Sequence, residues 1–287
     1  MKLFLFTLFI LQSLFLFGQD SILIIGHRGC RGLLPENSII SFQKALALGA
    51  DGIELDVIVN KDKQLVVSHE PYFQSSFCLD SVGNSIRNEG TFNIYELTQE
   101  QIRKFDCGSI GHPKFPMQEK IVSTKPLFSE FLSQVDMAGK TLLFEVKSSD
   151  GEYGRSQPYP EEYVSIILNE ISRIPASVDL MIMSFDRNLL EELHERSPEY
   201  RLVYLTYLPV KGIRSFLKDL TFKPYALGMF YPTVKKRKVH RLRASGVRIF
   251  SWTVNDEKKA TRLIRKGVEL IITDYPDQLI KIANARS

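Results

Sequence analysis

The sequence predicts one α/β domain folded as a TIM (β/α)8 barrel, with an insertion after the second strand. Along most of the 287 residues, short apolar runs typical of buried parallel strands alternate with amphipathic stretches of helical period. Eight such strand-like runs are present, which is the number that one barrel needs. A doubly wound fold is not favoured, because no Gly-x-Gly-x-x-Gly motif follows a strand.

The predicted strands are short and mostly apolar. They are Ile22–Ile25, Ile53–Val57, Leu142–Val146, Leu180–Ser184, Leu202–Thr206, Ala226–Met229, Ile249–Thr253 and Leu270–Thr273. The predicted helices between them are Ser38–Leu48, Glu161–Ile174, Arg187–Arg196, Val234–Ala244 and Glu257–Lys266. Gly49 and Gly267 follow the first and the last of these helices, and glycine is the residue that most often ends a helix.

Acidic residues alternate with apolar ones in the second predicted strand. Residues two apart share a face of a strand, so Glu54 and Asp56 point the same way. Glu145 and Lys147 repeat this arrangement in the third strand. Adjacent buried carboxylates repel each other, and a hard cation with oxygen ligands relieves that cost. We therefore expect Glu54, Asp56 and Glu145 to hold one Mg²⁺ or Ca²⁺ ion; the alternative is a solvated strand face, or acids that pair with Lys147.

Two histidines directly follow apolar strand-like runs. His27 follows Ile22–Ile25, and His69 follows a run at 65–67. Barrel enzymes place their chemistry at strand ends, and histidine exchanges protons near neutral pH. We therefore expect His27 and His69 to be an acid–base pair. The remaining histidines are expected to be structural: His112 in a Gly-His-Pro loop, and His194 and His240 in polar helical stretches.

An ordered set of short motifs runs along the chain. They are His-Arg-Gly (27–29), Pro-Glu-Asn-Ser (35–38), Gly-Ala-Asp-Gly-Ile-Glu-Leu-Asp-Val (49–57), Val-Val-Ser-His (66–69), Glu-Val-Lys (145–147), Ser-Phe-Asp (184–186), Trp-Thr-Val-Asn (252–255) and Thr-Asp-Tyr-Pro (273–276). Through this set the chain resembles the glycerophosphodiester phosphodiesterase family over roughly residues 21–285. It differs from the family pattern at Glu70, where the family usually has Asp, and at Asn60-Lys61-Asp62, where it often has Thr-x-Asp.

The resemblance implies hydrolysis of a glycerol-linked phosphodiester to glycerol 3-phosphate and an alcohol. It implies a divalent cation on the three carboxylates and acid–base catalysis by the two histidines, of which we expect His27 to be the base and His69 the acid. The substrate-binding residues are expected to be Arg28, Lys147, Glu36 and Trp252. For two of these residues a structural role is the alternative. Glu36 would then belong to the start of a helix, and Trp252 would be packed in the core. Asp274 is expected to cap the final helix rather than to bind the metal.

Two other functions remain open. A lipid-directed phosphodiesterase, of the lysophospholipase D or sphingomyelinase D type, would use the same histidines and metal on the same barrel. A barrel that binds phosphodiesters without hydrolysing them would need no acid–base pair. The net charge of +4 is mild and no dense basic stripe is present, so a nucleic-acid partner is not expected. The densest basic run, Lys235–Lys238, is typical of a solvated surface. Weak attraction to anionic head groups is the alternative.

Residues 71 to about 125 interrupt the alternation of strands and helices. A structureless loop of this length would be unusual in a compact domain. As in the family, we expect an insertion that packs over the barrel mouth and selects the alcohol group; the alternative is a purely structural cover. Of the three cysteines, Cys78 and Cys107 share this insertion and are the favoured pair, which leaves Cys30 unpaired.

The N-terminus carries the features of an export signal. Lys2 precedes an almost uninterrupted apolar stretch over residues 3–17, which is short for a membrane-spanning helix. We expect residues 1–19 to be a signal peptide, residues 20–287 to form the barrel domain, and the protein to be periplasmic or secreted. An uncleaved membrane anchor is the alternative. No cysteine directly follows the stretch, so a lipid-anchored lipoprotein is not expected.

Overall fold

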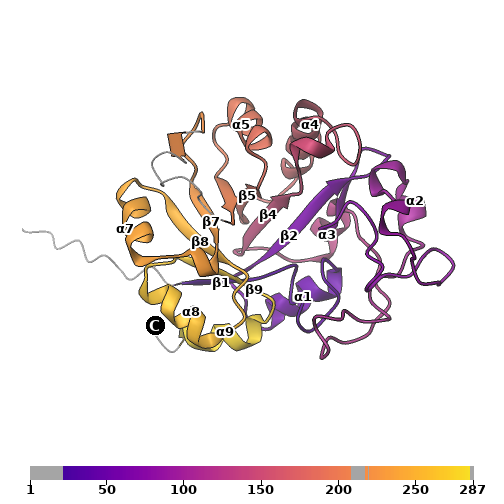
Figure 1. Cartoon of the computed structure of the whole chain (residues 1–287), viewed down its shortest axis with the longest axis horizontal. Helices are drawn as coiled ribbons and strands as arrows, with labels where there is room; N and C mark the ends of the chain where they lie inside the picture. The colour runs from indigo at the N-terminus through magenta and orange to yellow at the C-terminus, as the bar shows by residue number, and fades with distance from the viewer. Residues whose placement is uncertain (1–21, 208–216, 219, 285–287) are drawn as a thin grey trace, which may run out of the picture.

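The computed structural model describes residues 22–207, 217–218 and 220–284. Its parallel strands close into a ring with helices on the outside, which confirms the predicted TIM barrel (Figure 1). The strand order around the ring is β1-β9-β8-β7-β6-β5-β4-β2, and β1 pairs with β2 to close it. One further strand, β3, pairs antiparallel with β2 outside the ring.

The predicted strands coincide with the observed ones to within two residues at each end. The strands are β1 (Leu23–Gly26), β2 (Gly52–Val59), β3 (Leu65–Val67), β4 (Thr141–Val146), β5 (Asp179–Ser184), β6 (Leu202–Thr206), β7 (Ala226–Phe230), β8 (Arg248–Trp252) and β9 (Leu270–Thr273). They were recognisable because most of their residues are buried, so each strand reads as an apolar run.

Each predicted helix is also present. The helices are α1 (Ile39–Ala47), α2 (Gln99–Ile102), α3 (Phe128–Gln134), α4 (Pro160–Ile171), α5 (Arg187–Arg196), α7 (Lys236–Ala244), α8 (Glu257–Arg265) and α9 (Pro276–Asn284). The sequence predicted neither α2, which has only four residues, nor α3, which has seven and whose N-cap, Leu127, makes no side-chain capping bond. Helices this short are difficult to recognise from sequence.

Apolar side chains form two layers around the strands. The first fills the barrel and includes Ile25, Leu143, Met183 and Phe250. The second lies between the strands and the outer helices, where residues such as Phe42 and Tyr163 are fully buried. Each strand is thus held on both faces, which fixes the direction in which Glu54, Asp56 and Glu145 point.

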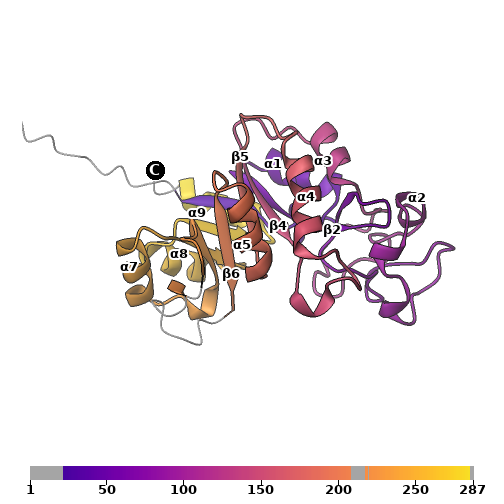
Figure 2. The same ribbon diagram turned by 90° about the horizontal axis from the view of Figure 1, so that it is seen from above.

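The insertion lies between β3 and α3. It has its own apolar cluster, which includes Phe73, Phe77, Ile94 and Phe105. A disulfide joins Cys78 to Cys107, the pair that the sequence favoured. Figures 1 and 2 show the insertion, with α2, on the opposite side of the molecule from α7 and α8.

The predicted signal peptide, residues 1–19, lies outside the described residues. Within the described part of the chain, every helix is too short or too polar to cross a bilayer.

Candidate active site at the barrel mouth

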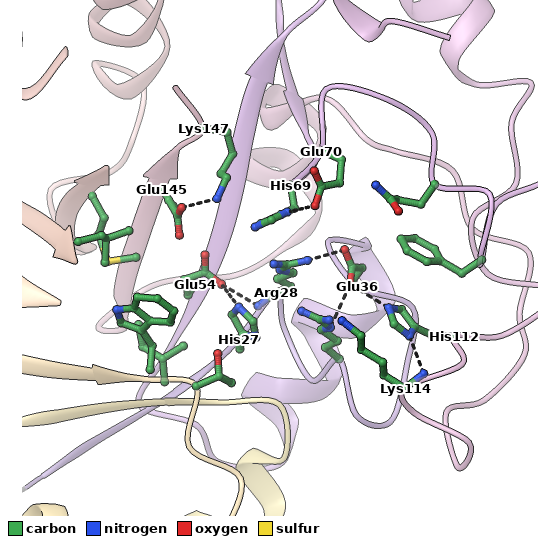
Figure 3. Close-up of a pocket in the computed structure, with 18 of the residues that line it drawn as sticks. His27, Arg28, Glu36, Glu54, His69, Glu70, His112, Lys114, Glu145 and Lys147 are labelled. Carbon is green, nitrogen blue, oxygen red and sulfur yellow. Dashed lines mark hydrogen bonds and ion pairs between the residues drawn. The ribbon is translucent and has the colours of Figure 1, made fainter. Parts of the chain in front are cut away.

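Three carboxylates from two neighbouring strands meet at the barrel mouth. Glu54 and Asp56 lie on β2, and Asp56 is in register with Glu145 on β4. One oxygen from each residue lies within 4.8 Å of the others, and all three residues are buried. Figure 3 shows the side chains of Glu54 and Glu145 in this cluster. Glu54 Oε1 and Asp56 Oδ1 have no hydrogen-bond partner although both are buried. A cluster of buried, unsatisfied oxygens of this kind is suited to a hard divalent cation.

The charges of this cluster are only partly balanced. Burial, Asp56 and Glu145 together raise the pKa of Glu54 well above its usual range. Burial also opposes ionisation of Asp56, but Arg28, Lys147 and other donors hold the pKa of this carboxyl below its usual range. Asn37 contributes to the same effect by donating from Nδ2 to Asp56 Oδ2 over 2.9 Å. An additional positive charge beside Glu54 would therefore stabilise the ionised form of the cluster.

His27 follows β1 and is held by a carboxylate from the adjacent strand. Its Nδ1 lies 2.6 Å from Asp274 Oδ1, and its Nε2 lies 3.9 Å from Glu54 Oε2. Because an ionised carboxylate only accepts hydrogen bonds, Nδ1 carries the proton and Nε2 is left to face the carboxylate cluster. Burial lowers the pKa of His27, and Asp274 partly opposes this shift.

The expectation that Asp274 caps the final helix was wrong. The residue follows β9, and its two carboxylate oxygens accept from His27 Nδ1 and from Asn255 Nδ2, the latter over 2.6 Å. The first residue of α9 is Pro276, so Asp274 lies before the capping position. Sequence reasoning missed this role because β1 and β9 become neighbours only when the barrel closes.

His69 reaches the same site by a different route. It follows β3, which runs antiparallel to β2 and so returns the chain towards Asp56, whose backbone oxygen accepts from the amide of Ser68. His69 Nδ1 lies 2.6 Å from Glu70 Oε1, so the residue that departs from the family pattern is the one that holds the imidazole. Lys125 stabilises this turn, because its Nζ donates a hydrogen bond to Ser68 Oγ.

Two cations lie beside the carboxylates. Arg28, with a left-handed φ of 49°, places its Nε 3.1 Å from Asp56 Oδ2 and its Nη1 2.7 Å from Glu36 Oε1. Lys147 places its Nζ 2.6 Å from Glu145 Oε1. Although burial favours a neutral Glu36, the nearby Arg28 and Arg31 hold its pKa at about 2. Glu36 is therefore an anchor for arginine side chains and not only part of a helix entry.

These residues line a cavity of about 460 Å³ that has three kinds of wall. The charged wall includes His27, Arg28, Glu54 and Glu145. An aromatic wall is formed by Trp252, Phe185 and Tyr207, whose rings pack against one another with centroids 4.9–5.4 Å apart. The insertion supplies the third wall, which includes Phe77, His112 and Lys114.

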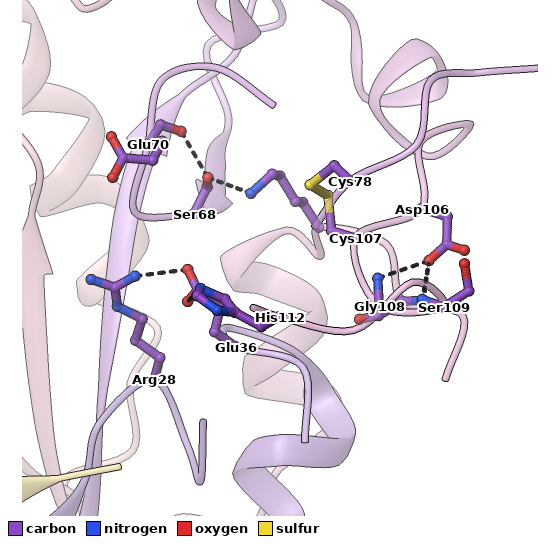
Figure 4. Close-up of a disulfide and its surroundings, with 12 residues drawn as sticks. Arg28, Glu36, Ser68, Glu70, Cys78, Asp106, Cys107, Gly108, Ser109 and His112 are labelled. Carbon is purple, nitrogen blue, oxygen red and sulfur yellow. Dashed lines mark hydrogen bonds and ion pairs between the residues drawn. A yellow bond between two sulfur atoms is a disulfide. The ribbon is translucent and has the colours of Figure 1, made fainter. Parts of the chain in front are cut away.

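His112 belongs to the cavity and not merely to a structural loop. Its ring stacks on Phe77 with centroids 4.7 Å apart. Its Nε2 lies 3.9 Å from Glu36 Oε2, and both residues are labelled in Figures 3 and 4. The sequence assigned it a structural role because a Gly-His-Pro loop gives no indication of its neighbours. The ring does have structural contacts, since its Nδ1 accepts from the amide of Lys114. Its position on the cavity wall could not be read from the local sequence.

Comparisons with known proteins agree with this architecture. Residues 27–278 match the Glycerophosphoryl diester phosphodiesterase family. A glycerophosphodiester phosphodiesterase of Caldanaerobacter subterraneus is 31% identical, with 91% of this chain and 97% of the relative covered. A solved protein from Silicibacter pomeroyi is 26% identical, with a TM-score of 0.82 and coverage of 93% and 94%.

A more distant solved structure carries a bound product. A phosphodiesterase of Oleispira antarctica, in complex with sn-glycerol-3-phosphate, has 23% identity, a TM-score of 0.75 and coverage of 92% and 96%, and so shares the fold. Taken with the family match over residues 27–278, the comparisons show that the chain belongs to the glycerophosphoryl diester phosphodiesterase family and is a phosphoric diester hydrolase.

Proposed function

We propose that this protein hydrolyses glycerophosphodiesters to glycerol 3-phosphate and an alcohol, with the help of one divalent cation and two histidines. The observation that carries the proposal is a pair of imidazoles, each with Nδ1 held by a carboxylate, beside three buried carboxylates. This arrangement leaves both Nε2 atoms available for proton transfer. The family membership gives the reaction class.

The cation would be held by Glu54, Asp56 and Glu145, whose carboxylate oxygens lie close together and fit Mg²⁺ or Ca²⁺. Glu54 and Asp56 each keep one buried oxygen without a hydrogen-bond partner. When bound, such an ion neutralises negative charge on a phosphodiester. Arg28 and Lys147 lie next to the same carboxylates and are suited to bind phosphate oxygens, with the guanidinium of Arg28 already oriented by Glu36.

The two histidines would share the proton transfers. We assign His27 as the base, because Asp274 fixes its proton on Nδ1 and burial favours the neutral ring. It would deprotonate the nucleophile, either water or the neighbouring glycerol hydroxyl. His69, held by Glu70, would then protonate the leaving alkoxide. Trp252 would form a wall of the glycerol pocket, since it lines the cavity beside Phe185.

The aromatic wall keeps a lipid-directed phosphodiesterase as the second candidate. Trp252, Phe185 and the 59% exposed Tyr207 offer apolar surface next to the charged wall, which an acyl chain could contact. A lysophospholipase D or a sphingomyelinase D would use the same histidines, so the two candidates differ only in substrate. A phosphodiester-binding barrel without turnover is the third and least favoured candidate.

The decisive test is release of glycerol 3-phosphate from glycerophosphocholine and glycerophosphoethanolamine by the purified protein. Reactions with Mg²⁺, with Ca²⁺ and with EDTA would be run beside a His27→Ala control. Metal-dependent release that the control lacks would support the proposal. Release of product from lysophospholipids or sphingomyelin alone would move the assignment to a lipid-directed enzyme. A metal-induced rise in melting temperature without product from any substrate would favour binding without turnover.

We also propose that the protein is exported to the periplasm or secreted. The apolar stretch over residues 3–17 motivates this proposal, and the Cys78–Cys107 disulfide is compatible with it, because such bonds persist mainly outside the cytoplasm. Fractionation of expressing cells tests it. Recovery of unprocessed protein in the cytoplasm would contradict export, and recovery of processed protein in the periplasm or medium would support it.

A further inference from the structure

The charge of the chain is concentrated in one segment. Residues 235–266 contain twelve Lys and Arg but only two Asp and Glu, a surplus of ten positive charges. Because the whole chain has a net charge of +4, all remaining residues together carry a surplus of six negative charges. The sequence singled out only Lys235–Lys238 in this segment, since the second basic cluster lies beyond a buried strand.

The structure brings both clusters onto one surface. α7 and α8 lie side by side on the outside of the barrel (Figure 1), and Lys266 Nζ donates to Val234 O across the gap over 2.7 Å. We call this surface the basic face. Its exposed side chains are Lys235, Lys236, Arg237 and Arg241 on the α7 side, and Lys258, Lys259, Arg262 and Arg265 on the α8 side. The carboxylate of Glu269 forms ion pairs with Arg243 and Arg248, which are not among the side chains of the basic face.

The start of α7 opposes the usual charge preference of a helix. Lys235 is the N-cap without a side-chain capping bond, and Lys236, Arg237 and Lys238 follow with no acidic residue in the first turn. The N-terminus of a helix carries partial positive charge, so basic residues there lower stability. By contrast, the first turns of α4 and α8 contain glutamate. Four cations at this helix start are therefore not explained by the stability of the helix.

The basic face continues to the mouth of the barrel. In this fold each helix begins where the preceding strand ends, so the first turns of α7 and α8 lie on the side of the active site. A row of aromatic rings joins the two regions: Tyr207 contacts Phe230, Phe230 contacts Tyr231, and Lys259 Nζ donates to the Tyr231 hydroxyl. Tyr207 also lines the cavity and is 59% exposed.

We propose that the basic face docks the protein on an anionic phospholipid surface, with the mouth of the cavity close to the head groups. Basic side chains next to the exposed Tyr207 and the partly exposed Tyr231 are the combination that binds membrane interfaces, where lysine and arginine meet anionic lipids and aromatic rings enter the head-group region. Nucleic acid fits less well, because the rings of Tyr207, Phe230 and Tyr231 are engaged with neighbouring aromatic rings instead of forming a platform for stacked bases. Such docking adds a binding function that the hydrolytic reaction does not require.

A triple variant, Lys235→Gln/Lys236→Gln/Arg237→Gln, tests the proposal in the full chain. The control is Lys44→Gln/Lys61→Gln/Lys104→Gln, which removes the same charge from exposed lysines outside the basic face. Both chains keep the N-terminal segment, so any apolar binding through that segment is equal in the two. Co-sedimentation would compare vesicles of phosphatidylcholine alone with vesicles that also contain phosphatidylglycerol, at low and high salt.

We expect the parent and the control to bind phosphatidylglycerol vesicles better than neutral ones, and high salt to remove the difference. Each lysine or arginine near an anionic surface strengthens binding roughly fivefold, so the loss of three should weaken binding of the triple variant by about a hundredfold. Its kcat/KM on a water-soluble substrate should stay at the parent value. Equal binding to both vesicle types, or an equal loss in the control, would overturn the proposal. Salt-sensitive binding to heparin or DNA without vesicle binding would overturn it in favour of another polyanion.

Discussion

The cavity has two halves that are built in different ways. One half stands on the barrel strands: Glu54, Asp56 and Glu145 are set by the parallel register of β2 and β4, with strands buried on both faces. The other half comes from the insertion, where Phe77 and His112 are placed by ring stacking near a disulfide. The strand half is supported by a continuous ladder of paired strands, whereas the insertion half is held by an apolar cluster, a disulfide and isolated backbone bridges.

This difference indicates that the two halves divide the functions of the site between them. Proton transfer and metal binding need atoms fixed to within a fraction of an ångström, which strands supply. Substrate choice tolerates looser walls, and loops supply these. We therefore expect substitutions in the strand half to reduce turnover, and substitutions in the insertion half to alter stability or KM. Substitutions in each half test this division.

Removal of either proposed catalytic histidine should have the largest effect on rate. His27→Ala and His69→Ala should each lower kcat by about 10²–10⁴-fold, because general acid–base catalysis typically contributes that factor. The melting temperature should change little, since each ring is held mainly by one carboxylate. Steady-state kinetics on glycerophosphocholine measures this, with the exposed His240→Ala as control. A variant with near-parental turnover would remove that histidine from the mechanism.

The two halves also differ in how well the sequence predicted them. The strand half was predicted because alternation of period two places Glu54 and Asp56 on one face whatever the tertiary structure. The roles of His112 and Asp274 were missed, because the first depends on packing of the insertion against Phe77 and the second on barrel closure between β1 and β9. The sequence placed His69 at the barrel mouth, where it lies. It did not predict that β3 runs antiparallel to β2, which is how the chain brings His69 there.

Loss of the disulfide should destabilise the insertion half. A Cys78→Ser/Cys107→Ser variant should lose about 2–4 kcal/mol, the usual contribution of a bond that closes a loop of this kind. Its kcat should stay near the parent value while KM rises, because Phe77 is next to Cys78 and lines the cavity. Thermal unfolding with and without dithiothreitol measures the effect. Reduction should lower the melting temperature of the parent and leave that of the variant unchanged. A parent whose melting temperature does not change on reduction would show that the bond contributes nothing.

Glu36 lies where the two halves meet, and its contribution should depend on pH. The carboxylate has a pKa of about 2 in the folded protein, below its usual value, so its pairing with Arg28 and Arg31 stabilises the fold above the unfolded pKa. This stabilisation, about 3 kcal/mol, should be lost as pH falls from about 4.5 towards 2. Denaturant unfolding of the parent and of Glu36→Gln should therefore differ at pH 6 and converge towards pH 2. If the difference in unfolding free energy between the two proteins did not depend on pH, its cause would be packing and not charge.

Asp274 is expected to act through His27. Asp274→Asn should lower kcat by at least about tenfold, because the carboxylate fixes the proton on Nδ1. Since Asp274 raises the pKa of His27 against the effect of burial, its loss should lower that pKa further. The acidic limb of the kcat/KM profile should then shift to lower pH. Asp256→Asn, which removes the carboxylate that caps α8, should leave the profile in place. An unshifted limb in Asp274→Asn would mean that His27 is not the base.

The smallest expected effect is at His112 in the insertion half. His112→Gln should raise KM by roughly two- to tenfold, the worth of one neutral polar contact, and leave kcat within about twofold of the parent. The matched control is His194→Gln, because His194 stacks on Phe222 with the same 4.7 Å between ring centroids but lies away from the cavity. An equal change in both variants would indicate a general cost of losing a stacked ring. A fall in kcat comparable to that of His27→Ala would place His112 in the catalytic machinery, and the division between the two halves would then not hold.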